Sequence, residues 1–314
     1  MSRKLPVTLI FYRRPERLRA VLAAMRNYRP DTVFAVSDGA RSGDNMGAEQ
    51  VRESRRLLES EIDWPCRVER IFAETNLGLR TRVESGLDAV FQKTDFSMIL
   101  EDDCVPRPEF FGFVEEIRSH WEGSEKLGAI SGNCFLPARF MPKESYFFSR
   151  YPHIWGWATW AKCWQSHSKD DALWPPKGGL TSLWPDMERK ELSYWERIFN
   201  RVYEHELETW DYRWLLSFWH HGWLAATPNE NLVENTGFGE GATNTRDRSV
   251  DPGVERNGRL SFPLSHPGKL LRDTAADRAV FQNHYLRMEG RMSFLPRLWR
   301  SLRKRFLLSW KAGM

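Results

Sequence analysis

Residues 97–111 of the chain read SMILEDDCVPRPEFF. The short apolar run of this stretch leads directly into three consecutive carboxylates, Glu101, Asp102 and Asp103, which we call the acidic triplet. Adjacent carboxylates repel each other, so folding alone does not reward clustering them. A hard divalent cation such as Mg²⁺ or Mn²⁺ would, because it takes carboxylate oxygens and fills its shell with water and phosphate oxygens. The alternative interpretation is a solvated acidic turn that Pro106 ends.

Strands and helices are predicted to alternate around this stretch. The predicted strands are residues 5–12, 31–39, 66–74 and 96–100, and the predicted helices are residues 14–28, 47–61, 79–92 and 108–121. This alternation predicts an α/β fold with a mostly parallel central sheet flanked by helices. Ligands of such sheets bind beyond the carboxyl ends of the strands, where Asp38, the turn at 76–78 and the acidic triplet all lie. This convergence favours the metal interpretation of the triplet.

Composition and motifs exclude several classes of protein. The 314 residues are 41% hydrophobic and 28% charged, which is typical of a soluble globular protein. No apolar run is long enough to span a membrane, and the N-terminal run is too short for a secretion signal. The four cysteines form no C-x-x-C pair, so we expect reduced thiols in a cytoplasmic protein. A net charge of +4 does not indicate nucleic-acid binding, and neither a G-x-G-x-x-G motif after the first strand nor a P-loop is present.

A candidate general base lies in the segment ELETWDYRW, residues 206–214, in a region (186–222) predicted to be helical. Asp211 is flanked there by aromatic residues, and such surroundings raise the proton affinity of a carboxylate. That property suits removal of a proton from a hydroxyl group. The alternative is that Asp211 only caps a helix that begins at Tyr212. Glu206 and Glu208 are the lesser rivals for the base.

Tryptophan is concentrated in the second half of the chain. Of 15 tryptophans, 11 lie between Trp155 and Trp223. In HIWGWATW, residues 153–160, Trp155 and Trp157 could stack on a sugar face, and Gly156 would let the backbone approach closely. The alternative is that they belong to the core, where we expect most of these tryptophans. The glycine-rich segment 235–245 is either a lid over a bound ligand or a plain surface loop.

Four stretches together resemble one enzyme family. They are VTLIFYRRPERL (7–18), VFAVSDGA (33–40), ETNLGL (74–79) and SMILEDDCVPRPEFFGF (97–113). The chain resembles glycosyltransferases of the GT-A fold over roughly residues 5–245. The nearest likeness is to Golgi N-acetylglucosaminyltransferase I and its bacterial sugar-transferase relatives. The resemblance implies a nucleotide-diphospho-sugar donor, expected to be of UDP type, and Mn²⁺ or Mg²⁺ as the cofactor.

The resemblance also implies roles for individual residues on the donor side. Residues Thr8 to Phe11, with Arg13 just after, would line the pocket for the nucleotide base, and Asp38 would hydrogen-bond that base. Arg82, with its neighbour Arg80 at the start of a helix, could reach the diphosphate. The alternatives are a turn cap for Asp38, a solvent-exposed side chain for Arg13 and surface ion pairing for Arg82.

The metal and sugar contacts are assigned by the same resemblance. Asp103 would bind the metal directly, and His266 would complete the shell of the metal or of the diphosphate. Glu101 and Asp102 would contact the ribose, the donor sugar or water on the metal. The catalytic carboxylate would be Asp211. A lone histidine such as His266 is otherwise a structural residue.

We expect three parts in the chain. A single GT-A catalytic domain would cover residues 1–250, with a nucleotide-binding half at 1–110 and an acceptor-side half at 111–250. A C-terminal extension would cover residues 251–290. Residues 291–314 are rich in Lys and Arg and have apolar residues at helical spacing, which predicts an amphipathic helix on an anionic membrane surface. The alternative is a helix packed on the core.

The residue patterns and the family resemblance together predict a metal-dependent glycosyltransferase, and the resemblance implies that it inverts the anomeric configuration. Its acceptor would be a glycan or a lipid-linked sugar in bacterial surface polysaccharide synthesis. It would be cytoplasmic, with peripheral association at the inner membrane face through its tail. Two other classes stay open: a nucleotidyltransferase, which normally carries a glycine-rich signature that FYRRPERL lacks, and a non-enzymatic protein that binds or perturbs membranes through the basic tail.

Overall fold

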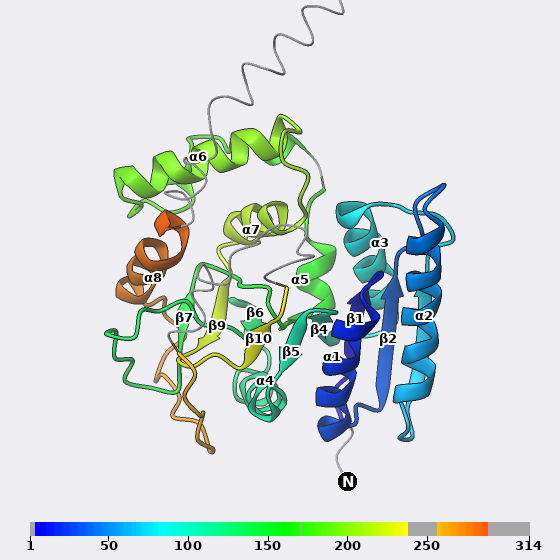
Figure 1. Ribbon diagram of the computed structural model, residues 1–314. Helices are drawn as coiled ribbons and strands as arrows, with labels where there is room; N and C mark the ends of the chain where they lie inside the picture. Colours follow the sequence, from blue (N-terminus) through cyan, green and yellow to red (C-terminus); the bar gives the residue numbers. More distant parts are fainter. Residues whose placement is uncertain (1–3, 170, 238–255, 288–314) are drawn as a thin grey trace, which may run out of the picture.

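The computed structural model describes residues 4–169, 171–237 and 256–287 (Figure 1). Its centre is an eight-stranded sheet of order β3-β2-β1-β4-β8-β6-β9-β7. The strands are β1 (Val7–Phe11), β2 (Thr32–Ser37), β3 (Arg67–Phe72), β4 (Phe96–Glu101), β6 (Leu127–Ser131), β7 (Tyr146–Ser149), β8 (Trp157–Trp160) and β9 (Leu224–Pro228). Only β7 and β8 in this sheet run antiparallel to their neighbours. The predicted α/β class with a mostly parallel sheet is confirmed.

Helices cover both faces of this sheet. They are α1 (Pro15–Tyr28), α2 (Asn45–Glu61), α3 (Leu79–Phe91), α4 (Pro108–His120), α5 (Ala161–Gln165), α6 (Arg189–Tyr203), α7 (Asp211–His220) and α8 (Thr274–Val280), which continues into a π-helical turn (Phe281–Tyr285). Buried residues of α1, α2 and α4 share one core cluster, and those of α3, α5, α6, α7 and α8 share the other. The apolar faces predicted for the first and fourth helices are therefore the buried ones.

Residues 186–222, which were predicted to be helical, contain two helices, α6 and α7, with a break between them. His205 adopts a φ of 58°, a left-handed conformation that ends a helix. The chain then turns before Trp210, which precedes the first residue of α7. The break creates the helix start at which Asp211 stands.

A small second sheet lies beside the end of β4. It pairs β5 (Cys104–Pro106) with β10 (Val233–Asn235) in antiparallel fashion. Asn235 lies opposite Cys104, and the backbone N–H of Thr236 donates to the carbonyl oxygen of Asp103 at 2.7 Å. Residues more than 130 positions later in the chain are thus fixed against the acidic triplet.

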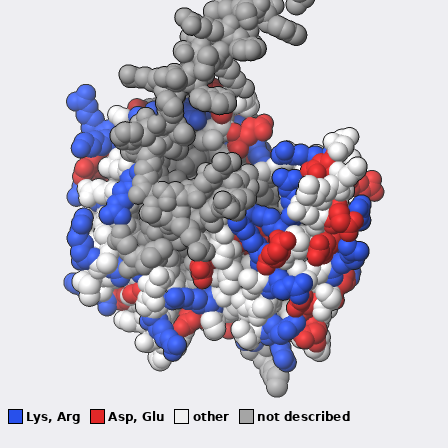
Figure 2. Space-filling view, in the orientation of Figure 1, with Lys and Arg blue, Asp and Glu red and all other residues white. Residues whose placement is uncertain are grey.

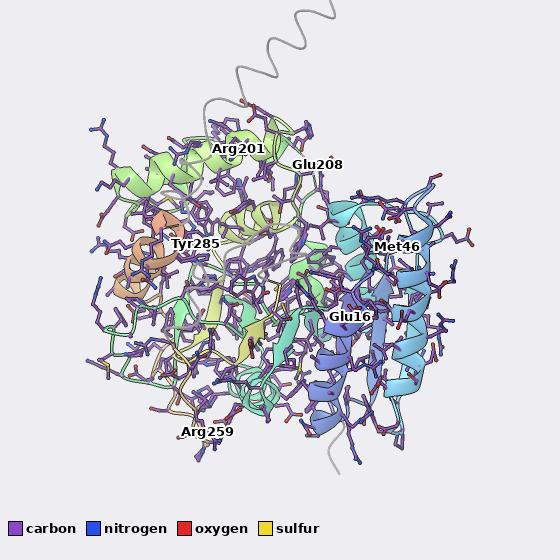
Figure 3. All side chains as sticks on the ribbon, viewed as in Figure 1. Glu16, Met46, Arg201, Glu208, Arg259 and Tyr285 are labelled. Carbon is purple, nitrogen blue, oxygen red and sulfur yellow. The ribbon has the colours of Figure 1, made fainter. Side chains whose placement is uncertain are left out.

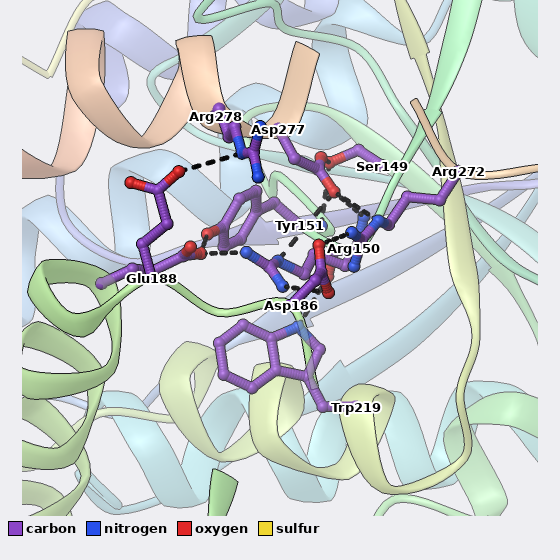
Figure 4. A network of polar contacts seen from close by, with 10 residues as sticks. Ser149, Arg150, Tyr151, Asp186, Glu188, Trp219, Arg272, Asp277 and Arg278 are labelled. Atoms are coloured by element: carbon purple, nitrogen blue, oxygen red, sulfur yellow. Dashed lines mark hydrogen bonds and ion pairs between the residues drawn. The ribbon is translucent and has the colours of Figure 1, made fainter. Parts of the chain in front are cut away.

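The segment 256–287 packs on the outer side of β7. Phe148 forms an isolated parallel bridge with Arg272, and the N–H of Asp273 donates to the carbonyl oxygen of Phe148 at 2.8 Å. Beneath it, the buried Arg150 lies within ion-pair distance of Glu191 and Asp277 (Figure 4). This network joins β7 to α6 and α8. At the opposite edge of the sheet, β3 carries exposed or half-buried charged side chains.

Surface and composition add three observations. Basic and acidic side chains are interspersed over the described part of the face in Figure 2. The four cysteines are free, and three of them are buried. Among the described residues, no helix combines the length and the apolar character needed to cross a membrane. The predicted tail helix over 291–314 and most of the predicted lid over 235–245 lie outside the described residues.

Candidate active site

A cavity of about 430 Å³ opens at the carboxyl ends of β1, β2 and β4, the edge of the sheet where a ligand was expected. The predicted site residues that line it are Phe11, Arg13, Asp38, Arg82, Glu101, Asp102, Asp103, Trp155 and Asp211. They come from both halves of the chain. The structure therefore brings most of the predicted site together in one place.

The acidic triplet forms one wall of this cavity. Glu101 ends β4, and the sheet register places it beside Ile10 of β1. Asp102 is buried, and its Oδ2 accepts from the backbone N–H of Tyr12 at 3.2 Å. The guanidinium of Arg14 bridges Asp102 and Asp103, and its Nη1 lies 2.8 Å from Asp103 Oδ2. Sequence reasoning did not single out Arg14.

Burial and mutual repulsion raise proton affinity within the triplet. Burial, followed by the charges of Asp103 and Asp102, raises the pKa of Glu101 to about 8. Burial also raises the pKa of Asp102 to about 6, although Arg14 opposes that effect. The charge of Asp211 contributes to the raised pKa of Glu101, so Asp211 is electrostatically close to the triplet. The carboxyls of the triplet thus repel one another, and Arg14 offsets this repulsion only in part.

The acidic triplet fits a divalent cation by the chemistry of its donors. Its side chains offer hard carboxylate oxygens, and Mg²⁺ in proteins is commonly held by one or two carboxylates together with substrate phosphates. No group of three or more His, Cys, Asp or Glu side chains within the described ranges forms a complete metal site. The fit of the triplet to a cation rests on the chemistry of its oxygen donors.

Asp211 stands at the first position of α7 and faces the cavity. The hydroxyl of Thr209 donates to its Oδ1, and burial raises its pKa to about 6. Its rivals Glu206 and Glu208 are exposed and do not line the cavity; Figure 3 labels Glu208. Of these three carboxylates, only Asp211 combines a place in the cavity with a raised pKa.

Both carboxylate oxygens of Asp38 accept hydrogen bonds from neighbouring residues of the protein. The donors are the backbone N–H groups of Gly39, Leu77 and Gly78 and the side-chain amide of Asn76, at 2.9 to 3.1 Å. The carboxylate therefore fastens the turn before α3 to the end of β2. This is the turn role that sequence analysis gave as the alternative, although Asp38 still lines the cavity.

Basic residues line the side of the cavity near Asp38. Arg13 forms an ion pair of 2.9 Å with Asp44, the residue that caps α2. Arg82 is buried, which lowers its pKa, and its Nε has no hydrogen-bond partner among the described residues. A desolvated guanidinium of this kind favours an anionic group on a ligand.

Four predicted site residues do not line the cavity. Thr8 is buried within β1, where its hydroxyl bonds to Ser97 at 2.8 Å. Trp157 is 1% exposed and packs among other tryptophans of the core. Gly156 serves a close approach inside the protein, since a Cβ there would lie 2.5 Å from a methyl group of Val233.

His266 is the fourth of these residues. Its Nε2 lies 3.2 Å from Glu116, its Nδ1 lies 3.0 Å from the hydroxyl of Tyr146, and its ring stacks on His120. None of these partners lines the cavity. The structure therefore does not bring His266 to the acidic triplet.

Comparisons with known proteins give only distant likenesses. No protein-family model matches the sequence, and no curated protein matches it. A mannosyltransferase from Pyrobaculum calidifontis in complex with GDP-Man and Mn²⁺ is similar at 11% identity and a TM-score of 0.37, over 70% of this chain and 69% of its own. A 4-diphosphocytidyl-2C-methyl-D-erythritol synthase from Anaerococcus prevotii is similar at 10% identity and a TM-score of 0.36, over 74% and 93%.

A UDP-glucose pyrophosphorylase complexed with UDP-glucose is similar at 5% identity and a TM-score of 0.31, over 52% of this chain and 78% of its own. None of these three proteins is N-acetylglucosaminyltransferase I, so that likeness stays a prediction. At such low TM-scores and identities, the three likenesses assign neither a family nor an activity to this chain.

Proposed function

We propose that this protein is a metal-dependent glycosyltransferase that uses a nucleotide-diphospho-sugar donor. One observation carries the proposal: the acidic triplet at the end of β4 and Asp211 at the start of α7 face the same cavity. The triplet has the oxygen donors for a divalent cation, and Asp211 has the raised pKa of a general base. Such a pair of carboxylate sites is what transfer from a diphosphate to a hydroxyl requires.

In this mechanism, Asp103 would hold the cation, with Asp102 and Glu101 beside it. A bound cation would supply positive charge to offset the charge of the departing nucleoside diphosphate. Asp211 accepts the proton of the acceptor hydroxyl as that oxygen bonds to the anomeric carbon. The bond from the anomeric carbon to the diphosphate oxygen breaks in the same step, which inverts the configuration. The hydroxyl of Thr209 orients the Asp211 carboxylate for this task.

The donor lies between the acidic and basic walls of the cavity in this proposal. Arg82 and Arg13 are available to its diphosphate, and Trp155 is available to stack on its sugar. We further propose a glycan or lipid-linked acceptor in bacterial surface polysaccharide synthesis at the cytoplasmic face of a membrane. This last part rests only on the sequence of residues 291–314 and on the family resemblance.

Calorimetric titration of UDP, GDP and dTDP tests the proposal, with Mn²⁺ and with a chelator. We expect one nucleotide to bind with Mn²⁺ and to lose at least about tenfold in affinity with chelator or in Asp103→Ala. Glu208→Ala is the matched control, because Glu208 is exposed and outside the cavity. If no nucleotide binds under either condition, the proposal is wrong. If the protein instead releases pyrophosphate from a nucleoside triphosphate and a sugar phosphate, it is a nucleotidyltransferase.

A further inference from the structure

The position that a cation would take beside the acidic triplet is held by Arg14. Its Nη1 donates to Asp103 Oδ2 at 2.8 Å, and its Nη2 donates to Asp102 Oδ1. The side chains of Asp102 and Asp103 are only 3% and 14% exposed, so this is a largely desolvated contact. Arg14 also lines the cavity.

The fold fixes this arrangement from both sides. Strands β1 and β4 are parallel neighbours, with Ile10 paired to Glu101, so the residues that follow each strand meet. Pro15 begins α1 directly after Arg14 and fixes the direction in which the chain leaves β1. The N–H of Tyr12 holds Asp102 from the same side. The guanidinium therefore faces the two carboxylates because of the chain path and not through a chance surface contact.

A count of oxygen atoms shows what remains for a ligand. Both oxygens of Asp102 have donors, Arg14 and the N–H of Tyr12. Among the described residues, Asp103 Oδ2 has Arg14 at 2.8 Å and Arg17 at 4.0 Å, and Asp103 Oδ1 has the weak thiol donor of Cys104 at 3.7 Å. A guanidinium and a divalent cation repel each other, so each weakens the binding of the other to the Asp103 carboxylate.

We propose that Arg14 is the counter-ion of the acidic triplet in the metal-free protein and leaves Asp103 when a divalent cation binds. The inference rests on the metal site of the proposed function. The released guanidinium stays in the same cavity, where its planar fork matches the oxygens of a donor diphosphate. Arg14 thereby exchanges a carboxylate partner for a phosphate partner. Metal binding then favours donor binding, because it frees Arg14 for the diphosphate. Donor binding in turn favours metal binding, because a diphosphate that binds Arg14 draws it away from Asp103.

Titration of Mn²⁺ into the full-length protein, followed by the electron paramagnetic resonance signal of free Mn²⁺, tests the exchange. Without nucleotide, the Mn²⁺ affinity of Arg14→Gln should be at least about tenfold higher than that of the original protein. This is the size of the effect that one adjacent charge has on the proton affinity of a carboxylate. Arg19→Gln is the matched control. Arg19 carries the same charge on α1, but it pairs with Glu61 and does not line the cavity. The Mn²⁺ affinity of this variant should change by no more than about threefold.

Arg14→Gln removes the positive charge beside the buried Asp102 carboxylate. If that variant does not fold, a second variant tests the same inference. Arg14→Lys keeps the charge but cannot bridge both carboxylates, and it should bind Mn²⁺ more tightly than the original protein. Unchanged or weaker Mn²⁺ binding in the folded variants would overturn the exchange. With Mn²⁺ saturating, Arg14→Gln should also lose about tenfold in nucleotide affinity.

The outcomes separate this inference from the proposed function. If the original protein binds a nucleotide only with Mn²⁺ and Arg14→Gln leaves Mn²⁺ affinity unchanged, the exchange is wrong and the proposed function stands. If Mn²⁺ affinity rises in Arg14→Gln but no nucleotide binds, the displacement of Arg14 from Asp103 by the cation stands and the proposed function is wrong. If a nucleotide binds equally well with chelator and Arg14→Gln abolishes that binding, Arg14 replaces the metal, which also overturns the exchange.

Discussion

Replacing Asp211 by asparagine should make the protein more stable, by an amount that depends on pH. Burial raises the pKa of this carboxyl from 3.8 to about 6. Between these two values, the unfolded chain has lost the proton that the folded protein still binds. Stability therefore falls as the pH rises through this window, and the penalty is complete above pH 6. Asparagine has the same shape, still accepts from the hydroxyl of Thr209, and never ionises.

The magnitude follows from the two pKa values. Their difference corresponds to about 3 kcal/mol once the carboxyl is ionised in both states. The Asp211 side chain is partly exposed to the cavity, and solvent there reduces the penalty. We therefore expect Asp211→Asn to raise the free energy of unfolding by about 1 to 3 kcal/mol at pH 8 and by almost nothing near pH 3.5.

Urea denaturation at several pH values between 3.5 and 8 measures this difference. Glu208→Gln serves as the control, because Glu208 is exposed and its replacement should leave the pH dependence unchanged. The same Asp211→Asn protein should lose at least about a hundredfold in sugar transfer, because its general base is gone. A stability difference that is constant with pH, or a loss at pH 8, would refute the reasoning. Asp211 would then ionise without a penalty, and the argument for it as a base would lose its basis.

Three further predictions concern the surroundings of the site. Arg150→Met should lower the free energy of unfolding by about 3 to 5 kcal/mol, because it leaves Glu191 buried without its guanidinium; a loss below about 1 kcal/mol in urea denaturation would contradict this. His266→Asn should leave Mn²⁺ affinity unchanged in the same resonance titration, since His266 does not line the cavity, and a tenfold loss would restore it as a ligand. Gly132→Ala should cost about 1 to 3 kcal/mol in thermal unfolding, because its Cβ would lie 2.5 Å from the carbonyl oxygen of Gly156. An unchanged melting temperature would show that the strand ends can move apart.

The first half of the fold could be predicted because its signals are local. Apolar periodicity locates β1, α1, β4 and α4, and Pro15 and Pro108 begin the two helices. Later elements depend on contacts that no short window contains. Strand β8 enters the sheet antiparallel between β4 and β6, and β10 pairs with β5 across more than 100 residues. The break between α6 and α7 rests on the backbone conformation of His205, a residue without a strong turn preference.

The candidate site could also be predicted only in part. The acidic triplet and Asp211 stand out by residue type and context, and the structure brings them to one cavity. Arg14 is different, because its role depends on β1 and β4 being neighbours, a fact of strand order. Arg14 was missed, whereas Trp157 was predicted in error. Its motif suggested a sugar contact, but the side chain is buried in the core.

The two edges of the sheet are protected in different ways, and this affects how the chain can be shortened. The charged side chains of β3 discourage another strand from pairing with it. The other edge strand, β7, is aromatic, with Tyr146, Phe147 and Phe148 in sequence, and the segment 256–287 shields its backbone. Removing that segment would uncover a strand of high β-propensity as a template for other chains. A shortened protein would therefore aggregate through β7 even though every residue that lines the cavity was retained.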